Sequence, residues 1–308
     1  MFALTLANLL ACILTAVICI RKGVFPRRQS RTLQLQKQKS ILQKGLYLFL
    51  YNSCFYFILI SIRTIISVNY TVEEFGYFTF SFTIANAVML LLDSFNTILF
   101  PKTIDLMSSD DNKKKADALE KMRVGYILTS HMLVYLAMIC FPILVWFIPK
   151  YMPALSSMNM IALAALMNTN SYGYSNMLIA QNKEHKAGFI SAVSLIVNII
   201  LGLGLAKILN VEYSYITIAI LVAYMISSFL MAYEGDTILR REKSVSYTLK
   251  HFFPIRMFIP YMIALIISCT QIEYLIFIPL LVFIMLNYKD LQFLKNIALK
   301  LIKEPEVI

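Results

Sequence analysis

The chain has 308 residues, of which 59% are hydrophobic and 15% charged, and its formal net charge is +11. With a mean hydropathy of +0.70, this composition is far from the soluble average and excludes a water-soluble domain. The positive charge does not predict nucleic-acid binding, because the basic residues adjoin apolar runs and form no folded basic surface. Anionic membrane lipids are the expected partners, at about 1 kcal/mol per basic side chain near the headgroups.

Apolar runs recur along the whole chain. A hydrocarbon core of about 30 Å requires roughly 20 predominantly apolar residues of helix, and on this basis the sequence predicts nine spans, the last two closely spaced. They are placed at 2–20, 46–66, 76–100, 125–148, 158–179, 188–207, 213–233, 257–270 and 273–287. The expected fold class is therefore an all-α, polytopic membrane helical bundle with about nine transmembrane helices.

The basic residues fall in alternate gaps between these runs. All Lys and Arg except Arg63, Lys150 and Lys207 lie in five gaps, which are Arg21–Lys44, Lys102–Arg123, Lys183–Lys186, Arg240–Arg256 and Lys289–Lys303. Short basic loops stay on the cytoplasmic side of a membrane. The pattern therefore predicts an N-terminus outside, a C-terminus in the cytoplasm, and short external loops.

The first span has its charges after the apolar run and no basic residues before it, which differs from a signal peptide. An external start with an odd number of spans is what the C-terminal part of a longer protein would show. The segment 21–45 is basic and free of acids, and it is either an inter-lobe linker on anionic lipid or a long positive-inside loop. Residues 288–308 place apolar side chains at helical spacing between lysines, which predicts an amphipathic tail in the cytoplasmic interface.

Polar residues inside the spans show a helical phase. The second span places Asn52, Tyr56 and Arg63 on one face, and the sixth does so with Ser191, Ser194, Asn198 and Gly202. The third span stacks Thr79, Thr83, Asn86, Asp93 and Thr97. Because polar groups in hydrocarbon are costly unless they face protein or a wet cavity, these faces either line a pathway or hold the helices together by hydrogen bonds.

The fifth span is the most polar, with nine consecutive residues from Asn168 to Asn176 that include Thr169, Asn170, Tyr172 and Tyr174. As one continuous helix it would place Asn168, Tyr172 and Asn176 on a common face. Amides, hydroxyls and tyrosine rings suit a carbohydrate, which offers many donors and acceptors and rests its apolar faces on rings. The alternative is hydrogen bonding between packed helices.

Two charged residues stand out inside the spans. Asp93 lies about 7 Å from the expected midplane at roughly 1.5 Å per residue, and it is either a coupling or gating residue, with His131 as a candidate partner, or a structural carboxyl group. Arg63 lies nearer the external end. It either snorkels to the surface or binds an anion such as a phosphate through paired donors.

No catalytic or cofactor motif appears. The sequence contains no HExxH, DxD, GxSxG or Walker loop, and its five cysteines have neither CxxC nor metal-ligand spacing. These observations favour a transporter over an enzyme, with no cofactor and no metal.

Three short motifs resemble a known family when taken in order. Glu74-Phe75-Gly76-Tyr77 opens the third span, Phe100-Pro101-Lys102 closes it before a charged helix at Asp110–Arg123, and Ala180-Gln181-Asn182-Lys183 closes the fifth span before Val193–Asn198. Across 40–235 the chain resembles the C-terminal part of a Wzx-type polysaccharide (O-antigen) flippase. This family belongs to the multidrug/oligosaccharidyl-lipid/polysaccharide exporter superfamily, which has a MATE-like fold.

The resemblance implies a domain plan and a function. Residues 1–20 would be the last helix of an otherwise missing first lobe, 21–45 the linker, 46–235 the six-helix second lobe, and 236–287 a basic loop with two additional helices. The implied function is flipping of a polyprenyl-pyrophosphate-linked oligosaccharide across the bacterial inner membrane in surface polysaccharide or lipopolysaccharide synthesis. A separate first-lobe chain or other polysaccharide-assembly proteins are the implied protein partners.

Within that function Arg63 is assigned to the pyrophosphate, and Asp93 and His131 to coupling or gating. The polar residues Asn52, Asn86, Asn168, Tyr172, Asn176 and Asn198 are assigned to the sugar. Two alternatives remain, a drug or small-solute exporter of the same superfamily and a membrane polymerase or glycosyltransferase of the same pathway. The small external loops disfavour the enzyme.

Overall fold

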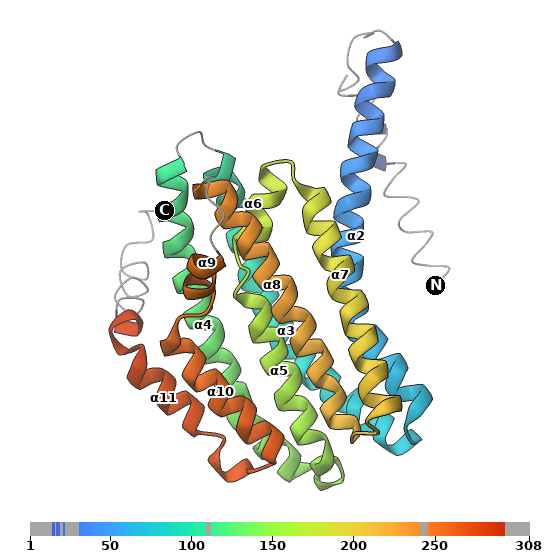
Figure 1. Ribbon diagram of the computed structural model, residues 1–308, viewed down its shortest axis with the longest axis vertical. Helices are drawn as coiled ribbons and strands as arrows, with labels where there is room; N and C mark the ends of the chain where they lie inside the picture. The colour runs from blue at the N-terminus through green and yellow to red at the C-terminus, as the bar shows by residue number, and fades with distance from the viewer. Residues whose placement is uncertain are drawn as a thin grey trace. The chain divides into compact units, whose positions relative to one another are not determined.

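The computed structural model describes residues 31–108, 112–240 and 245–292, together with Leu14, Thr15, Val17, Ile18 and Arg21. Every regular element in these ranges is a helix (Figure 1). The chain divides into two compact units, residues 1–46 and 47–308. The second unit contains α2 from Tyr47 onward and all later helices.

Five helices in the described ranges are long and apolar enough to cross a membrane. They are α2 (Arg31–Asn69), α3 (Val72–Ser108), α4 (Asn112–Phe147), α7 (Glu184–Leu203, continued by a π-helical turn, Gly204–Ile208) and α8, which is Thr217–Arg240 preceded by the 3-10 turn η3 (Tyr213–Ile216). The predicted class, a helical bundle of membrane type, is confirmed.

The nine predicted spans are not all present as separate long helices. The first, at 2–20, lies almost wholly outside the described residues. The fifth is divided into α5 (Leu155–Thr169) and α6 (Tyr174–Ala180), and the last two are the short helices α10 (Ile255–Thr270) and α11 (Ile278–Leu286). A further short helix, α9 (Val245–Phe252), precedes α10.

Two segments expected to be loops or separate helices are extensions of the spans. The basic segment before the second span is helical from Arg31 and continues into α2 without a break. Similarly, the charged segment before the fourth span forms the first turns of α4 from Asn112. Long charged helix ends of this kind carry the chain out of an apolar layer while keeping its backbone hydrogen-bonded.

The turn between α2 and α3 is defined by a capping box. The backbone N–H of Thr71 donates to Glu74 Oε2 at 2.9 Å, and the N–H of Glu74 donates to Thr71 Oγ1 at 3.2 Å. This reciprocal pair satisfies two donors at the start of α3. Glu74 in the Glu74–Tyr77 motif therefore has a local structural role.

Helix α5 is the centre of the second unit. Its side chains are buried on every face, and every residue from Leu155 to Met167 is buried, because α3, α4, α8 and α10 pack against it. The helix is mostly apolar, and apolar side chains on several faces of one helix are stabilised when other helices surround it. On the outer side α7 packs on α8, and α10 pairs with α11, which also contacts α4.

The connections alternate between two ends of the bundle. The start of α4, the α6–α7 turn and the end of α8 lie at one end, shown uppermost in Figure 1, and α10 begins below α9, about halfway along the bundle. These connections carry basic residues such as Lys183 and Lys186, whereas Lys150 and Lys207 of the second unit lie in or next to connections at the other end. The α2–α3, α4–α5, α7–α8 and α10–α11 connections lie at the other end (Figure 1).

Candidate functional site

The polar stretch of the fifth span is a break in the helix. Helix α5 ends at Thr169, the chain turns through 170–173, and α6 begins at Tyr174. Gly173 has a φ of 81°, and a Cβ at this position would lie 2.2 Å from Leu119 Cδ1. The position therefore needs glycine, both for its left-handed backbone and for the close approach of α4.

The break corrects the prediction that Asn168, Tyr172 and Asn176 share one face of a continuous helix. Tight turns replace the helical ladder, since Ser171 N–H donates to Asn168 O at 3.2 Å and Tyr172 N–H to Thr169 O at 3.0 Å. Asn and Ser side chains favour such turns by bonding the nearby backbone, as Ser171 Oγ does with Asn168 O at 2.9 Å. Tyr172 and Asn176 are buried and Asn168 is half-buried.

A buried arginine binds the break. Arg123 of α4 is 3% exposed. One guanidinium nitrogen donates to Asn170 O at 3.1 Å and the other to the hydroxyl of Tyr174 at 3.0 Å. The guanidinium also lies over the Tyr174 ring, 4.4 Å from its centroid. Arg123 thus satisfies a carbonyl that the broken helix leaves free.

The network continues through Tyr174 to a buried carboxylate. The Tyr174 hydroxyl donates to Asp236 Oδ1 at 3.0 Å, and Thr248 Oγ1 donates to Asp236 Oδ2 at 3.0 Å. We call Arg123, Tyr174, Asp236 and Thr248 the latch. It joins α4, α6, α8 and α9 at the end of the bundle that carries the basic turns, and it offsets one buried positive charge with one negative charge through a shared hydroxyl.

Sequence reasoning missed the latch. Arg123 was counted among the residues of a basic gap, and the latch joins residues from four separate segments. One local signal was present, since Gly235 precedes Asp236 in α8. A Cβ on Gly235 would lie 2.3 Å from Tyr174 Cδ1, so a small residue there admits the tyrosine ring.

Asp93 lies on α3 with its side chain exposed, and its carboxylate interacts electrostatically with the phenol groups of Tyr51, Tyr126 and Tyr224. These tyrosines come from α2, α4 and α8. We call these four residues the Asp93 cluster. Three helices that are distant in sequence therefore each place a tyrosine within electrostatic range of one carboxylate.

The cluster adjoins the helix break. The ring of Tyr126 stacks on that of Tyr172 with centroids 4.1 Å apart, and Tyr51 forms a side-chain hydrogen bond with Ser175. In the described residues the hydroxyl of Tyr224 is buried without a hydrogen-bond partner. The sequence singled out both Asp93 and the polar stretch Asn168–Asn176. The structure thus brings these two features close together.

His131, the candidate partner of Asp93, lies elsewhere in contact with α11. It is fully buried, its ring stacks on Phe283 at 5.5 Å, and its Nδ1 lies 3.1 Å from the Tyr135 hydroxyl. No ion pair joins His131 to Asp93 within the described ranges. The described contacts therefore give His131 a packing environment of aromatic rings.

The substrate-binding residues predicted on α2 and α3 lie on the outer faces of these helices. Arg63 and Asn52 are exposed and Asn86 is half-buried. The Arg63 guanidinium lies 5.5 Å from the centroid of Phe75. Arg63 lies about 9 Å from the end of α2 and Asp93 about 31 Å from the start of α3, at roughly 1.5 Å per residue. The two therefore occupy different depths and do not form one contact site.

Asn198 packs α7 against α2. Its Nδ2 donates to Ile58 O at 2.8 Å and to Ser61 Oγ at 2.9 Å, and the side chain has no exposed surface. One turn further, Gly202 lets Ile62 and Ile65 of α2 approach closely. Small residues and an interhelical amide are the usual means of close packing between membrane helices. On this face of α7 the Asn198 amide therefore holds two helices together, which is the second of the two interpretations that the sequence allowed.

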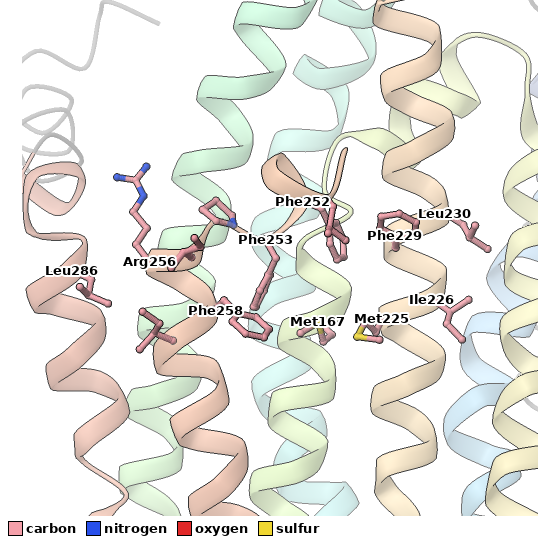
Figure 2. Close-up of a pocket in the computed structure, with 14 residues that line it drawn as sticks. Met167, Met225, Ile226, Phe229, Leu230, Phe252, Phe253, Arg256, Phe258 and Leu286 are labelled. Carbon is pink, nitrogen blue, oxygen red and sulfur yellow. The ribbon is translucent and has the colours of Figure 1, made fainter. Parts of the chain in front are cut away.

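A large apolar groove lies between α8 and α10, with α9 at one end. Its volume is about 1200 Å³, and Met167, Met225, Phe229, Phe253 and Phe258 are among its lining residues. Figure 2 shows these side chains from α5, α8, α10 and the segment after α9 around one gap, with the Arg256 guanidinium pointing away from them. Arg256 pairs with Asp290 at 2.5 Å.

The groove and the break are adjacent in the chain, because Met167 lines the groove and Asn168 begins the polar stretch. An apolar surface with room for a long hydrocarbon chain thus lies beside a buried polar turn.

Comparisons with known protein families, curated proteins and solved structures found no match to this chain.

Proposed function

We propose that this protein is a membrane flippase that moves a polyprenyl-pyrophosphate-linked oligosaccharide between leaflets during surface polysaccharide synthesis. The single observation that carries the proposal is the apolar groove of about 1200 Å³ between α8 and α10, beside a helix break in a bundle of membrane type. An amphipathic substrate with a long apolar tail and a polar head needs both surfaces at once.

Discontinuous helices support a transport role. Non-helical backbone at membrane depth is tolerated where it is buried in protein or lines a cavity, and transporters place such breaks at their substrate sites. Here the break is accompanied by the Asp93 cluster, whose hydroxyls, together with the stacked rings of Tyr126 and Tyr172 beside them, suit sugars. Asp93 is assigned to gating or coupling within the proposal.

Arg63 is assigned to the pyrophosphate. It is exposed on a membrane-spanning helix, and in the described residues its contact is an aromatic ring and not a carboxylate. A guanidinium without a bound carboxylate is suited to bind phosphate oxygens in pairs. The alternation of basic and non-basic ends favours the cytoplasmic placement of the basic turns and of the C-terminus, with the N-terminus outside, in a bacterial inner membrane.

Exposed polar groups on α2 and α3 support a further partner in the membrane. Asn52, Arg63 and Asp93 are exposed on helices of the second unit, and such groups are costly against lipid. A separate first-lobe chain would cover them, and the cavity would then lie between the two lobes. Other polysaccharide-assembly proteins are the second class of partner in the proposal.

One observation favours a second candidate. The groove lining is almost wholly apolar, which also suits a drug or small-solute exporter of the same superfamily. A membrane polymerase or glycosyltransferase of the pathway is less well supported, because the external connections are short and carry no catalytic constellation in the described ranges.

The test is complementation in a strain from which the gene has been deleted. We expect Arg63→Ala to reduce surface glycan at least about tenfold, equivalent to roughly 1.4 kcal/mol, and Arg63→Lys to restore part of it. Lys207→Ala is the matched control, since Lys207 is also exposed on a membrane-spanning helix and should leave glycan unchanged. Normal surface glycan with Arg63→Ala at equal protein levels would remove this assignment.

A further inference from the structure

A second cavity lies at the end of the bundle opposite the basic turns. Its volume is about 320 Å³. It is formed by the 3-10 helix η1 (Pro149–Ala154), the start of α5, the α7–α8 connection and the α10–α11 connection. Its polar lining comprises Ser156, Asn159, Glu212, Ser268 and Gln271.

The two serines offer only acceptors to this cavity. Ser156 Oγ donates its proton to Ser268 O at 2.9 Å, and Ser268 Oγ donates to Ala264 O at 2.8 Å. Each hydroxyl has one proton, so only lone pairs remain for a bound molecule. The serines therefore cannot donate to an anion without breaking these bonds.

Asn159 and Glu212 extend this acceptor set. Asn159 is 3% exposed, and its Oδ1 has no hydrogen-bond partner in the described part of the chain. Glu212 precedes η3 and is exposed, so its carboxylate is accessible from water. A buried amide oxygen without a partner costs free energy, which a donating ligand would recover.

The helix ends around the cavity also favour a positive charge. Helix α10 ends at Thr270, so its last carbonyls carry the negative end of the helix dipole toward Gln271. Free backbone N–H groups at the start of a helix would favour an anion, but the start of α5 does not present a full set of them to the cavity. It continues from η1, and the N–H of Leu155 already donates to Met152 O.

We propose that this cavity binds a small primary ammonium group. Three N–H donors match the acceptors of Ser156, Asn159 and Glu212, and the carbon skeleton would rest on apolar side chains such as Leu155 and Ile276. The lining contains no aromatic residue, whereas quaternary ammonium sites use aromatic cages. A transition-metal ion is disfavoured, because the described residues contain no group of three or more His, Cys, Asp or Glu side chains that could hold one.

The same ammonium chemistry has two sources, a free amine in water and the headgroup of phosphatidylethanolamine. The site does not depend on the proposed function, and binding is measured without transport.

The test uses the purified full chain in bilayer discs of phosphatidylglycerol, with ethanolamine as the probe in titration calorimetry or saturation-transfer NMR. We expect ethanolamine to bind about tenfold or more tightly than tetramethylammonium, which has the same charge but no N–H donor. Glu212→Gln should weaken ethanolamine binding about tenfold, a change equivalent to roughly one charge-assisted hydrogen bond. The control is Glu73→Gln, which changes an exposed carboxylate at the start of α3. This variant should bind ethanolamine as tightly as the parent protein does.

A second arm separates the two sources. Discs that contain phosphatidylethanolamine should prevent ethanolamine binding if the headgroup occupies the cavity, and should leave it unchanged if free amines do. Either result supports the ammonium site. The proposal is overturned if ethanolamine binds no better than to discs without protein, if tetramethylammonium or sodium binds equally well, or if Glu212→Gln has no effect.

Discussion

Removal of one hydroxyl tests whether the latch holds the broken helix. Tyr174→Phe keeps the ring over Arg123 but deletes the hydroxyl that accepts from Arg123 and donates to Asp236, each at 3.0 Å. Hydrogen bonds to charged groups contribute roughly 1.5–3 kcal/mol each. Because Arg123 keeps its bond to Asn170 O and Asp236 keeps Thr248, we expect a loss of about 3 kcal/mol, near the lower end for two bonds.

The assay is thermal unfolding in detergent. At about 2.1 cal/mol/K of unfolding entropy per residue, 1 kcal/mol lowers the midpoint of a chain of 308 residues by roughly 1.5 °C, so Tyr174→Phe should lower it by about 5 °C. The control is Tyr274→Phe, because Tyr274 is 77% exposed and surface changes stay within about 0.5 kcal/mol. Equal unfolding midpoints for the two variants would refute the claim that the latch stabilises the fold.

A double-mutant cycle distinguishes a charge network from simple packing. Asp236→Leu alone leaves Arg123 as a buried unpaired charge and should cost about 3–5 kcal/mol. Arg123→Met combined with Asp236→Leu removes both charges and should cost less than the sum of the single changes. Additive losses would show that the two residues act independently.

Two further predictions concern backbone and packing, and both are read as unfolding midpoints. Gly173→Ala should destabilise the protein by about 2–4 kcal/mol, from a positive φ and a clash with Leu119, whereas Gly76→Ala, with open space around it, should be neutral or stabilising by up to about 1 kcal/mol. Asn198→Ala should cost about 1–3 kcal/mol through its lost bonds to α2, and a loss no larger than that of the exposed Thr64→Ala would contradict its packing role.

The class of fold is predictable from the sequence, because hydropathy and the spacing of basic gaps are local properties of the chain. The same pattern also predicts that successive connections between helices lie alternately at the two ends of the bundle. What the pattern could not show is the break at 170–173. Asn170 and Ser171 lie within an apolar window long enough to span a membrane, and the decisive constraint, the close approach of Leu119 to Gly173, comes from another helix.

The candidate site was predictable only in part. Helical phase placed Asp93 on the polar face of the third span, but the tyrosines around it come from α2, α4 and α8, and their meeting depends on tertiary packing. Phase alone also could not separate a cavity face from a packing face. Asn198 illustrates this limit, since its amide is occupied by Ile58 and Ser61.

The leaflet distribution of the lipid-linked oligosaccharide, measured in cells without this gene, tests the central claim most directly. The flippase account predicts that the complete polyprenyl-pyrophosphate oligosaccharide accumulates on the cytoplasmic leaflet, where an added periplasmic probe cannot reach it. Restoring the gene should return it to the outer leaflet. An unchanged distribution would contradict the account, and single repeat units on the outer leaflet would instead indicate a polymerase.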